Sequence, residues 1–137
     1  MLIAVVDGQG AGIGQTVIKK IKREFEDKVK VVALGLNKTA LKNMLKSGAE
    51  EGILGSKKIS EYILNNQIDF IIGPIGILCT GGICGEVTST VSKAIFNSPA
   101  TKLIIPLQKH GIYIPNTLDL SIKECIEVFI EKIREQI

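Results

Sequence analysis

Apolar and polar residues follow one another along the chain in a repeating order of strand-like and helix-like segments. Residues 2–6 are an unbroken apolar run, and residues 29–34 are interrupted only by Lys30. Such runs are typical of strands that are covered on both faces. Between them, in residues 12–26, apolar positions recur at helical spacing, and Lys, Arg and Glu fill the other positions. The pattern therefore predicts a strand, a helix and a second strand.

The same alternation continues to the end of the chain. Further strands are predicted at residues 51–54, 69–73 and 102–107, the last ended by Pro106. Asn37 and Ser56 are predicted to cap helices, and a third helix is predicted over residues 86–97. The predicted inward residues of these three helices are Leu41, Met44 and Leu45, then Ile59, Tyr62 and Ile63, then Val87, Val91, Ala94 and Ile95.

The last predicted helix begins with a capping-box pattern, Ser121-x-x-Glu124. Its predicted inward residues are Ile122, Ile126, Phe129, Ile130, Ile133 and Ile137. Strands that alternate with helices favour right-handed crossovers and a mainly parallel sheet. We therefore expect one domain, over residues 1–137, with a three-layer, Rossmann-like α/β fold and about five strands.

Composition narrows the possible functions. The chain has 137 residues, of which 45% are hydrophobic and 23% charged, with a net charge of +3, and this balance is typical of a globular domain. It has no Trp, two Tyr and four Phe, so an aromatic platform for nucleic acid is not expected. The longest charge-free run, residues 70–85, is too short and too rich in Gly to span a membrane. Three cysteines and the absence of a signal-peptide pattern favour the cytoplasm.

A glycine-rich segment joins the first predicted strand to the first predicted helix: Gly8, Gln9, Gly10, Ala11, Gly12, Ile13 and Gly14. Residues without Cβ let the backbone approach a phosphate, which the amides and dipole of a helix N-terminus favour. The pattern G-x-x-x-G-I-G resembles the dinucleotide fingerprint of short-chain dehydrogenases. The resemblance implies a bound nucleotide, whereas tight packing of strand against helix is the alternative explanation of the glycines.

Two neighbours of this segment have alternative roles. Asp7 either bonds the loop amides or holds a cation such as Mg²⁺ beside a phosphate, and we favour the first. No acidic residue follows the second strand, where nicotinamide sites bind the adenosine ribose. Asn37 and Lys38 stand there instead and suit the 2′-phosphate of NADP, unless Asn37 is only the helix cap and Lys38 a solvated residue.

The dehydrogenase resemblance ends after this first turn. That family carries a catalytic Tyr-x-x-x-Lys, whereas here Tyr62 is followed four positions later by Asn66, and Tyr113 by Thr117. The proton relay of hydride transfer is therefore absent from these positions. His110 has no identifiable partner as an acid or base, and Lys109 is better suited to contact a phosphate. The sequence predicts no particular reaction.

A second long glycine-rich segment, residues 73–85, is apolar throughout, and its apolar residues need a cover. We favour a homodimer contact through residues 74–85 that also walls the ligand cleft, with Gly73, Pro74, Ile75 and Gly76 near the base or ribose. Burial against the chain's own core, a flat apolar ligand and a short buried helix over residues 77–84 are the alternatives. Cys79 and Cys84 are expected to be buried thiols rather than a metal or redox pair.

Glu86 follows this segment and is expected in the first turn of its helix, on the ligand side. A role in binding ribose hydroxyls or a metal is the alternative to a simple first-turn charge. We assign no metal site.

The whole chain also resembles a family of small bacterial proteins that is classed as a domain of unknown function. The matching segments are residues 7–10, 12–14, 33–35, 73–77 and 85–88. This resemblance implies no activity. The leading hypothesis is a cytoplasmic domain that binds NADP or a mononucleotide, with phosphates on residues 8–14. The alternative is a regulatory or interaction protein without catalytic activity that dimerises through residues 74–85.

Overall fold

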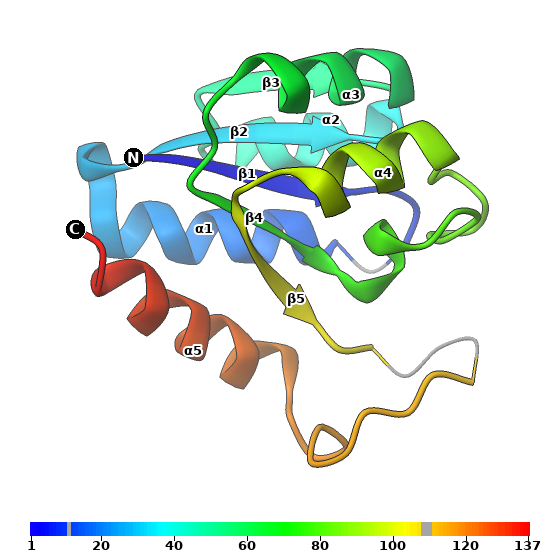
Figure 1. Cartoon of the computed structure of the whole chain (residues 1–137). Coiled ribbons are helices and arrows are strands. Elements are labelled where there is room, and N and C mark those ends of the chain that lie inside the picture. Colours follow the sequence, from blue (N-terminus) through cyan, green and yellow to red (C-terminus); the bar gives the residue numbers. More distant parts are fainter. Residues whose placement is uncertain (11, 108–110) are drawn as a thin grey trace.

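A computed structural model describes residues 1–10, 12–107 and 111–137 (Figure 1). Strands and helices alternate through these residues as predicted. The strands are β1 (Leu2–Asp7), β2 (Lys30–Gly35), β3 (Glu51–Leu54), β4 (Phe70–Pro74) and β5 (Thr101–Ile105). The α-helices are α1 (Ile13–Phe25), α2 (Lys38–Lys46), α3 (Ser56–Asn65), α4 (Ser89–Asn97) and α5 (Ile122–Arg134). Two short 3-10 helices, η1 (Glu26–Lys28) and η2 (Ile75–Leu78), follow α1 and β4.

The five strands form one parallel sheet in the order β3-β2-β1-β4-β5. Pairing of Asp7 with Gly35 brings the ends of β1 and β2 to the same edge of the sheet. The strand order reverses between β1 and β4, so the segments after these two strands leave the sheet side by side. In open parallel sheets this is where ligands bind.

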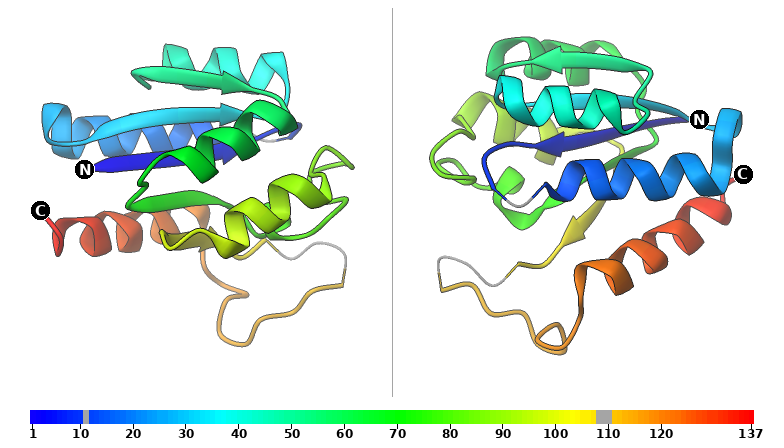
Figure 2. Two further views of the ribbon diagram at one scale, coloured as in Figure 1. Left: turned by 45° about the horizontal axis from the view of Figure 1, so that its top comes forward. Right: turned by 180° about the vertical axis from the view of Figure 1, so that it is seen from behind.

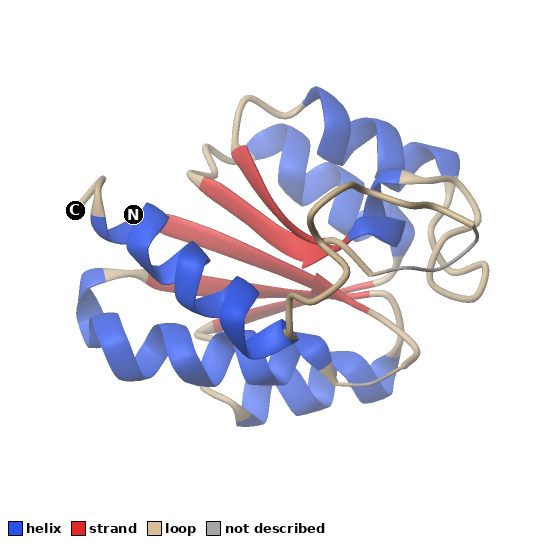
Figure 3. Ribbon diagram, turned by 90° about the horizontal axis from the view of Figure 1, so that it is seen from below, coloured by secondary structure: helices blue, strands red, loops and turns tan. Residues whose placement is uncertain are grey.

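Helices cover both faces of the sheet (Figures 2 and 3). Ile3 and Val5 of β1 pack on the side of α1, α2 and α5, whereas Ala4 and Val6 pack on the side of α3 and α4. Each of these four side chains is fully buried. The apolar runs therefore mark strands covered on both faces, and the three-layer α/β class is confirmed.

Helix α5 begins as predicted, because the Ser121 hydroxyl accepts from the Glu124 amide and the Glu124 carboxylate accepts from the Ser121 amide. Its end is fixed to α1, since Arg134 donates to Glu24 at 3.1 Å and lies 5.8 Å from the centre of the Phe25 ring. Ile137 was predicted to face inward but is 56% exposed, because the helix ends at Arg134.

Two other local predictions are wrong. Ser56 is the first residue of α3 rather than its cap, since the N-cap is Gly55, whose φ of +89° suits glycine. Leu45 is 41% exposed rather than inward. It lies over Gly52 of β3, which is the strand at one side of the sheet that the described residues form. Among the described residues, no helix is both long enough and apolar enough to cross a membrane.

Candidate functional site

A cavity of about 490 Å³ opens at the carboxyl ends of β1 and β2. This volume lies within the range of small-molecule sites, roughly 300–1,000 Å³. The cavity is bordered by the segment after β1, by the first turns of α2 and by one residue of the β4–α4 segment. Its lining residues are Asp7, Gly8, Gln9, Gly10, Gly12, Gln15, Asn37, Thr39, Ala40, Asn43 and Glu86.

Asp7 braces the glycine loop from below. Its carboxylate accepts hydrogen bonds from the backbone amides of Gly8 and Gly14, each at 2.8 Å, and the residue is 6% exposed. A Cβ at Gly14 would lie 2.8 Å from the Cβ of Asp7, so the glycine allows this approach. The expected role of Asp7 as a loop brace is thus confirmed, and two of the loop amides are already engaged.

Burial raises the pKa of the Asp7 carboxyl above its ordinary value. The two amide hydrogen bonds act in the opposite direction, and the negative charge of Glu86 adds to the rise. The cavity floor therefore holds a buried acid whose charge is disfavoured by its surroundings.

Glu86 reaches across the sheet edge into the same cavity. One carboxylate oxygen, Oε1, accepts from the Gln9 amide at 2.7 Å, and the other, Oε2, accepts from the Asn37 side-chain amide at 3.0 Å. The Asn37 carbonyl oxygen in turn accepts from the Ala40 amide at 2.8 Å and caps α2. The proposed cap role of Asn37 is confirmed, and the residue also positions Glu86.

The backbone before Glu86 explains its position. Gly81 donates to the Val87 carbonyl at 2.8 Å, and Val87 donates to the Gly82 carbonyl at 3.1 Å, so the chain closes on itself. Ile83 and Cys84 have φ values of +51° and +53°, which non-glycine residues rarely adopt. These turns prevent a helix from extending through this segment.

Helix α4 consequently begins at Ser89, with Thr88 as its cap, and not at residue 86 as predicted. Glu86 is therefore not a first-turn charge of this helix. It lines the cavity at the carboxyl ends of β1 and β2, but it does so from an irregular segment.

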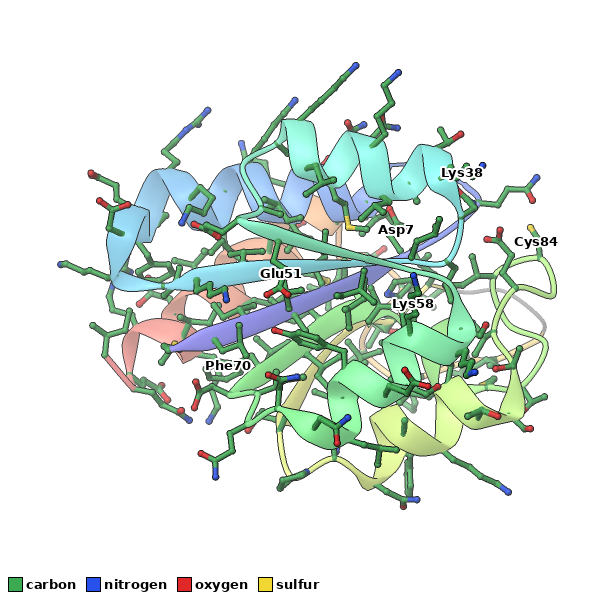
Figure 4. The ribbon with its side chains drawn as sticks, turned by 90° about the horizontal axis from the view of Figure 1, so that it is seen from above. Asp7, Lys38, Glu51, Lys58, Phe70 and Cys84 are labelled. Atoms are coloured by element: carbon green, nitrogen blue, oxygen red, sulfur yellow. The ribbon has the colours of Figure 1, made fainter. Side chains whose placement is uncertain are left out.

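The second glycine-rich segment is largely covered by the chain itself. Ile77 in η2 is fully buried, and Leu78 and Ile83 pack against the same core cluster. Cys79 and Cys84 are exposed, which corrects the expectation of buried thiols. Ile77 and Ile83 point toward the core, whereas Cys79 and Cys84 face solvent, and Cys84 lies at the outer edge of the segment (Figure 4).

Five of the predicted binding residues line the cavity: Gly8, Gln9, Gly10, Gly12 and Asn37. Ile13 and Gly14 are buried beneath the loop, and Lys38 is exposed. The four residues Gly73, Pro74, Ile75 and Gly76 do not line it. Gly73 instead packs closely on Ile77 and the Val6 carbonyl. Ala11, Lys109 and His110, which carried further predictions, lie outside the described residues.

Four lining residues are not predicted from the sequence: Gln15, Thr39, Ala40 and Asn43. Thr39 and Asn43 are one helical turn apart on α2, where the other polar residues are lysines apart from Asn37 at the cap. Two uncharged polar residues one helical turn apart are the sequence feature that could have indicated this part of the cavity lining.

The cavity is polar and acidic. Asp7 and Glu86 are its ionisable lining residues. Among the described residues, no group of three or more His, Cys, Asp or Glu side chains is placed to hold a metal ion. A second cavity, of about 630 Å³, lies at the opposite edge of the sheet between the ends of α3 and α4. It is away from the strand ends at which ligands usually bind.

A family model matches residues 2–137. The chain belongs to the family described as a domain of unknown function, DUF3842. No curated protein matches the chain. Membership of this family implies no particular activity.

Several solved structures are similar to the chain. The universal stress protein from Archaeoglobus fulgidus is 15% identical, covers 77% of this chain and 98% of its own, with a TM-score of 0.46. A universal stress protein in complex with cAMP is 14% identical, with coverages of 74% and 94% and a TM-score of 0.43. A dodecameric FMN-dependent UbiX-like decarboxylase from Escherichia coli O157:H7 is 9% identical, with coverages of 99% and 93% and a TM-score of 0.47.

Proposed function

We propose that the cavity at the carboxyl ends of β1 and β2 binds a nucleotide, and that a mononucleotide is the ligand it suits best. The observation that carries the proposal is the position of this cavity. It lies against the glycine loop and the start of α2, at the edge where parallel α/β sheets bind ligands. Its size and mostly polar lining suit a sugar and a base that offer several hydrogen-bonding groups.

The hydrogen bonds of the loop amides favour one position for the phosphate of the proposed ligand. The amides of Gly8 and Gly14 donate to Asp7, and the amide of Gln9 donates to Glu86. A phosphate that bound to any of these three amides would have to compete with a carboxylate. We place it beside Gly10 and Gly12, at the N-terminal end of α1. There the dipole of helix α1 favours an anion.

The position of Glu86 supports one of the two ligands that the sequence suggests. An NADP 2′-phosphate beside Asn37 would meet the Glu86 carboxylate, which is hydrogen-bonded to that same Asn37. Two negative charges in contact within a partly buried cleft repel each other strongly. A nucleotide whose ribose carries no phosphate at this position avoids the repulsion, and we therefore favour a mononucleotide over NADP.

A thermal-shift and calorimetric panel of AMP, GMP, CMP, UMP, FMN, NAD and NADP tests the proposal. A ligand at a hundred times its Kd should stabilise the fold by about 2.7 kcal/mol. Asn43→Leu should remove the effect, because Asn43 lines the cavity, whereas Asn97→Leu, the same change at the other cavity, should not. If no nucleotide stabilises the wild-type chain, the proposal is wrong.

A further inference from the structure

The geometry around Glu86 points to the chemical group that the site recognises. We propose that the Glu86 carboxylate binds the two neighbouring hydroxyls of an unmodified ribose. This inference rests on the proposed function, and it makes the site selective for ribonucleotides over 2′-deoxy and 2′-phosphorylated ones.

The carboxylate is held in one orientation by two donors. The Gln9 amide holds Oε1 and the Asn37 side-chain amide holds Oε2. Asn37 cannot turn its amide round without losing the bond from the Ala40 amide to its carbonyl oxygen. Both oxygens of Glu86 are therefore fixed from the protein side.

Each oxygen still has room for a further donor. An ionised carboxylate accepts about four hydrogen bonds, two on each oxygen. The hydrogen bonds to Glu86 from described residues use one on each. Since Glu86 lines the cavity, the remaining sites are available to a ligand there. A pair of hydroxyls on adjacent carbons is a group that donates to both oxygens of one carboxylate.

The position of the carboxylate is that of a ribose-binding acid. Dinucleotide-binding domains hold the ribose with an Asp or Glu near the end of the second strand. In this chain Asn37 follows the second strand, and the acidic side chain beside it belongs to Glu86, 49 residues further along the chain. Gly8 lets it approach, because a Cβ at Gly8 would collide with Glu86 Oε1.

A different role for Glu86 makes the opposite prediction. The carboxylate could instead stand in for a ligand phosphate on the Gln9 amide and be displaced when that ligand binds. Removal of its charge would then strengthen nucleotide binding. If Glu86 binds ribose hydroxyls, removal of its charge weakens ribonucleotide binding.

Calorimetry on the full-length chain distinguishes the two roles. The probes are AMP, GMP, CMP and UMP, their 2′-deoxy counterparts, and adenosine 2′,5′-bisphosphate. We expect wild-type protein to bind the best ribonucleotide at least about tenfold more tightly than its 2′-deoxy form. The 2′-deoxy form lacks the hydroxyl that donates a hydrogen bond to the charged Glu86 carboxylate. We expect the 2′-phosphorylated form to bind still more weakly. Glu86→Gln should bring the three affinities together, and Glu127→Gln, an exposed change on α5, should leave the wild-type order.

Three outcomes would overturn the inference. Equal binding of ribo and deoxy forms by the wild type would do so while leaving the proposed function in place. Tighter binding by Glu86→Gln would assign Glu86 the displaced role. If no nucleotide binds, the proposed function fails, and titration with free ribose decides the inference by NMR. A shift of the Asn37 side-chain amide in wild type but not in Glu86→Gln supports it, and the absence of a shift overturns it.

Discussion

The Asp7 carboxylate accepts a hydrogen bond from the Gly14 amide at 2.8 Å, which ties the last residue of β1 to the first turn of α1. Its other oxygen accepts from Gly8 at the same distance. The N-cap residue of helix α1 is Gly12, which offers no side-chain cap. Asp7 therefore replaces the missing cap and also joins Gly8 and Gly14, at the two ends of the glycine loop, to the end of β1.

Replacement of Asp7 by alanine should destabilise the fold. It leaves two buried amides without partners, at a cost of about 1–3 kcal/mol each, partly offset by removal of a buried charge. We expect the free energy of unfolding in urea to fall by about 2–3 kcal/mol. Asp69→Ala is a control, since that carboxylate accepts from one amide, Leu2, at an exposed position. A loss no larger for Asp7→Ala than for the control would contradict the bracing role.

The alternation of strands and helices could be predicted from the sequence because each element is marked by a pattern within its own residues. The buried strands are apolar runs, and α2 and α5 begin with side-chain caps, Asn37 and Ser121, at the predicted places. The predicted start of helix α4 is too early. The left-handed backbone of Ile83 and Cys84, which keeps the preceding segment irregular, cannot be recognised from these residue types. Backbone closure through Gly81 and Val87 is what ends the irregular segment there.

Only the part of the candidate site that is local in sequence could be predicted. The glycine loop is local in sequence, so Gly8, Gln9, Gly10 and Gly12 were found. The contact between Gln9 and Glu86 spans 77 residues and depends on the order of the strands. A single sequence does not give that order, and so the meeting of Glu86 with Asn37 could not be predicted from residue types alone.

Gly8→Ala tests whether Glu86 must sit against the loop. The added methyl group would meet Glu86 Oε1 and lie 2.9 Å from the Ile83 side chain, so it should push the carboxylate off the Gln9 amide. We expect nucleotide binding to fall at least tenfold, with only a modest loss of stability, by calorimetry and thermal unfolding. Gly52→Ala adds the same group on β3, away from the cavity, and should bind like wild type. Unchanged binding by Gly8→Ala would argue against a fixed Glu86.

The capping box of α5 should contribute measurably to stability. Ser121→Ala removes the hydroxyl that accepts from the Glu124 amide at 3.0 Å, and such changes cost about 1 kcal/mol. We expect a lower urea midpoint with an unchanged dependence on urea concentration. Ser89→Ala, an exposed change in the first turn of α4, serves as the comparison. Equal midpoints for the two variants would show that the box adds nothing beyond an ordinary serine.

The homodimer predicted through residues 74–85 remains a prediction, and light scattering tests it. A dimer would scatter as twice the 14.8 kDa chain. Cys79→Arg places bulk and charge at an exposed position of this segment and should convert such a dimer into monomers. Val128→Arg, at a 63% exposed position on α5, should not. A monomeric wild-type chain at micromolar concentration would remove the dimer hypothesis.

The raised pKa of Asp7 predicts the sign of one pH effect. Between its ordinary value of 3.8 and its raised value in the fold, the folded chain binds more protons at this site than the unfolded chain. The associated stability is therefore fully present below pH 3.8 and is lost as the pH rises through the raised pKa. Subtracting the unfolding free energy of Asp7→Asn isolates the effect, because other carboxyls, such as Glu50 with its lowered pKa, occur in both chains.

We expect this difference to shift in favour of wild type as the pH falls from about 7 to about 4. The charge of Glu86 is one cause of the raised pKa, after burial, so the shift should occur at lower pH in a Glu86→Gln background. Urea unfolding of the four chains at several pH values gives the comparison. A constant difference would mean that the two amide bonds cancel the effect of burial on the pKa of Asp7, and a difference that moves against wild type in acid would mean that they outweigh it.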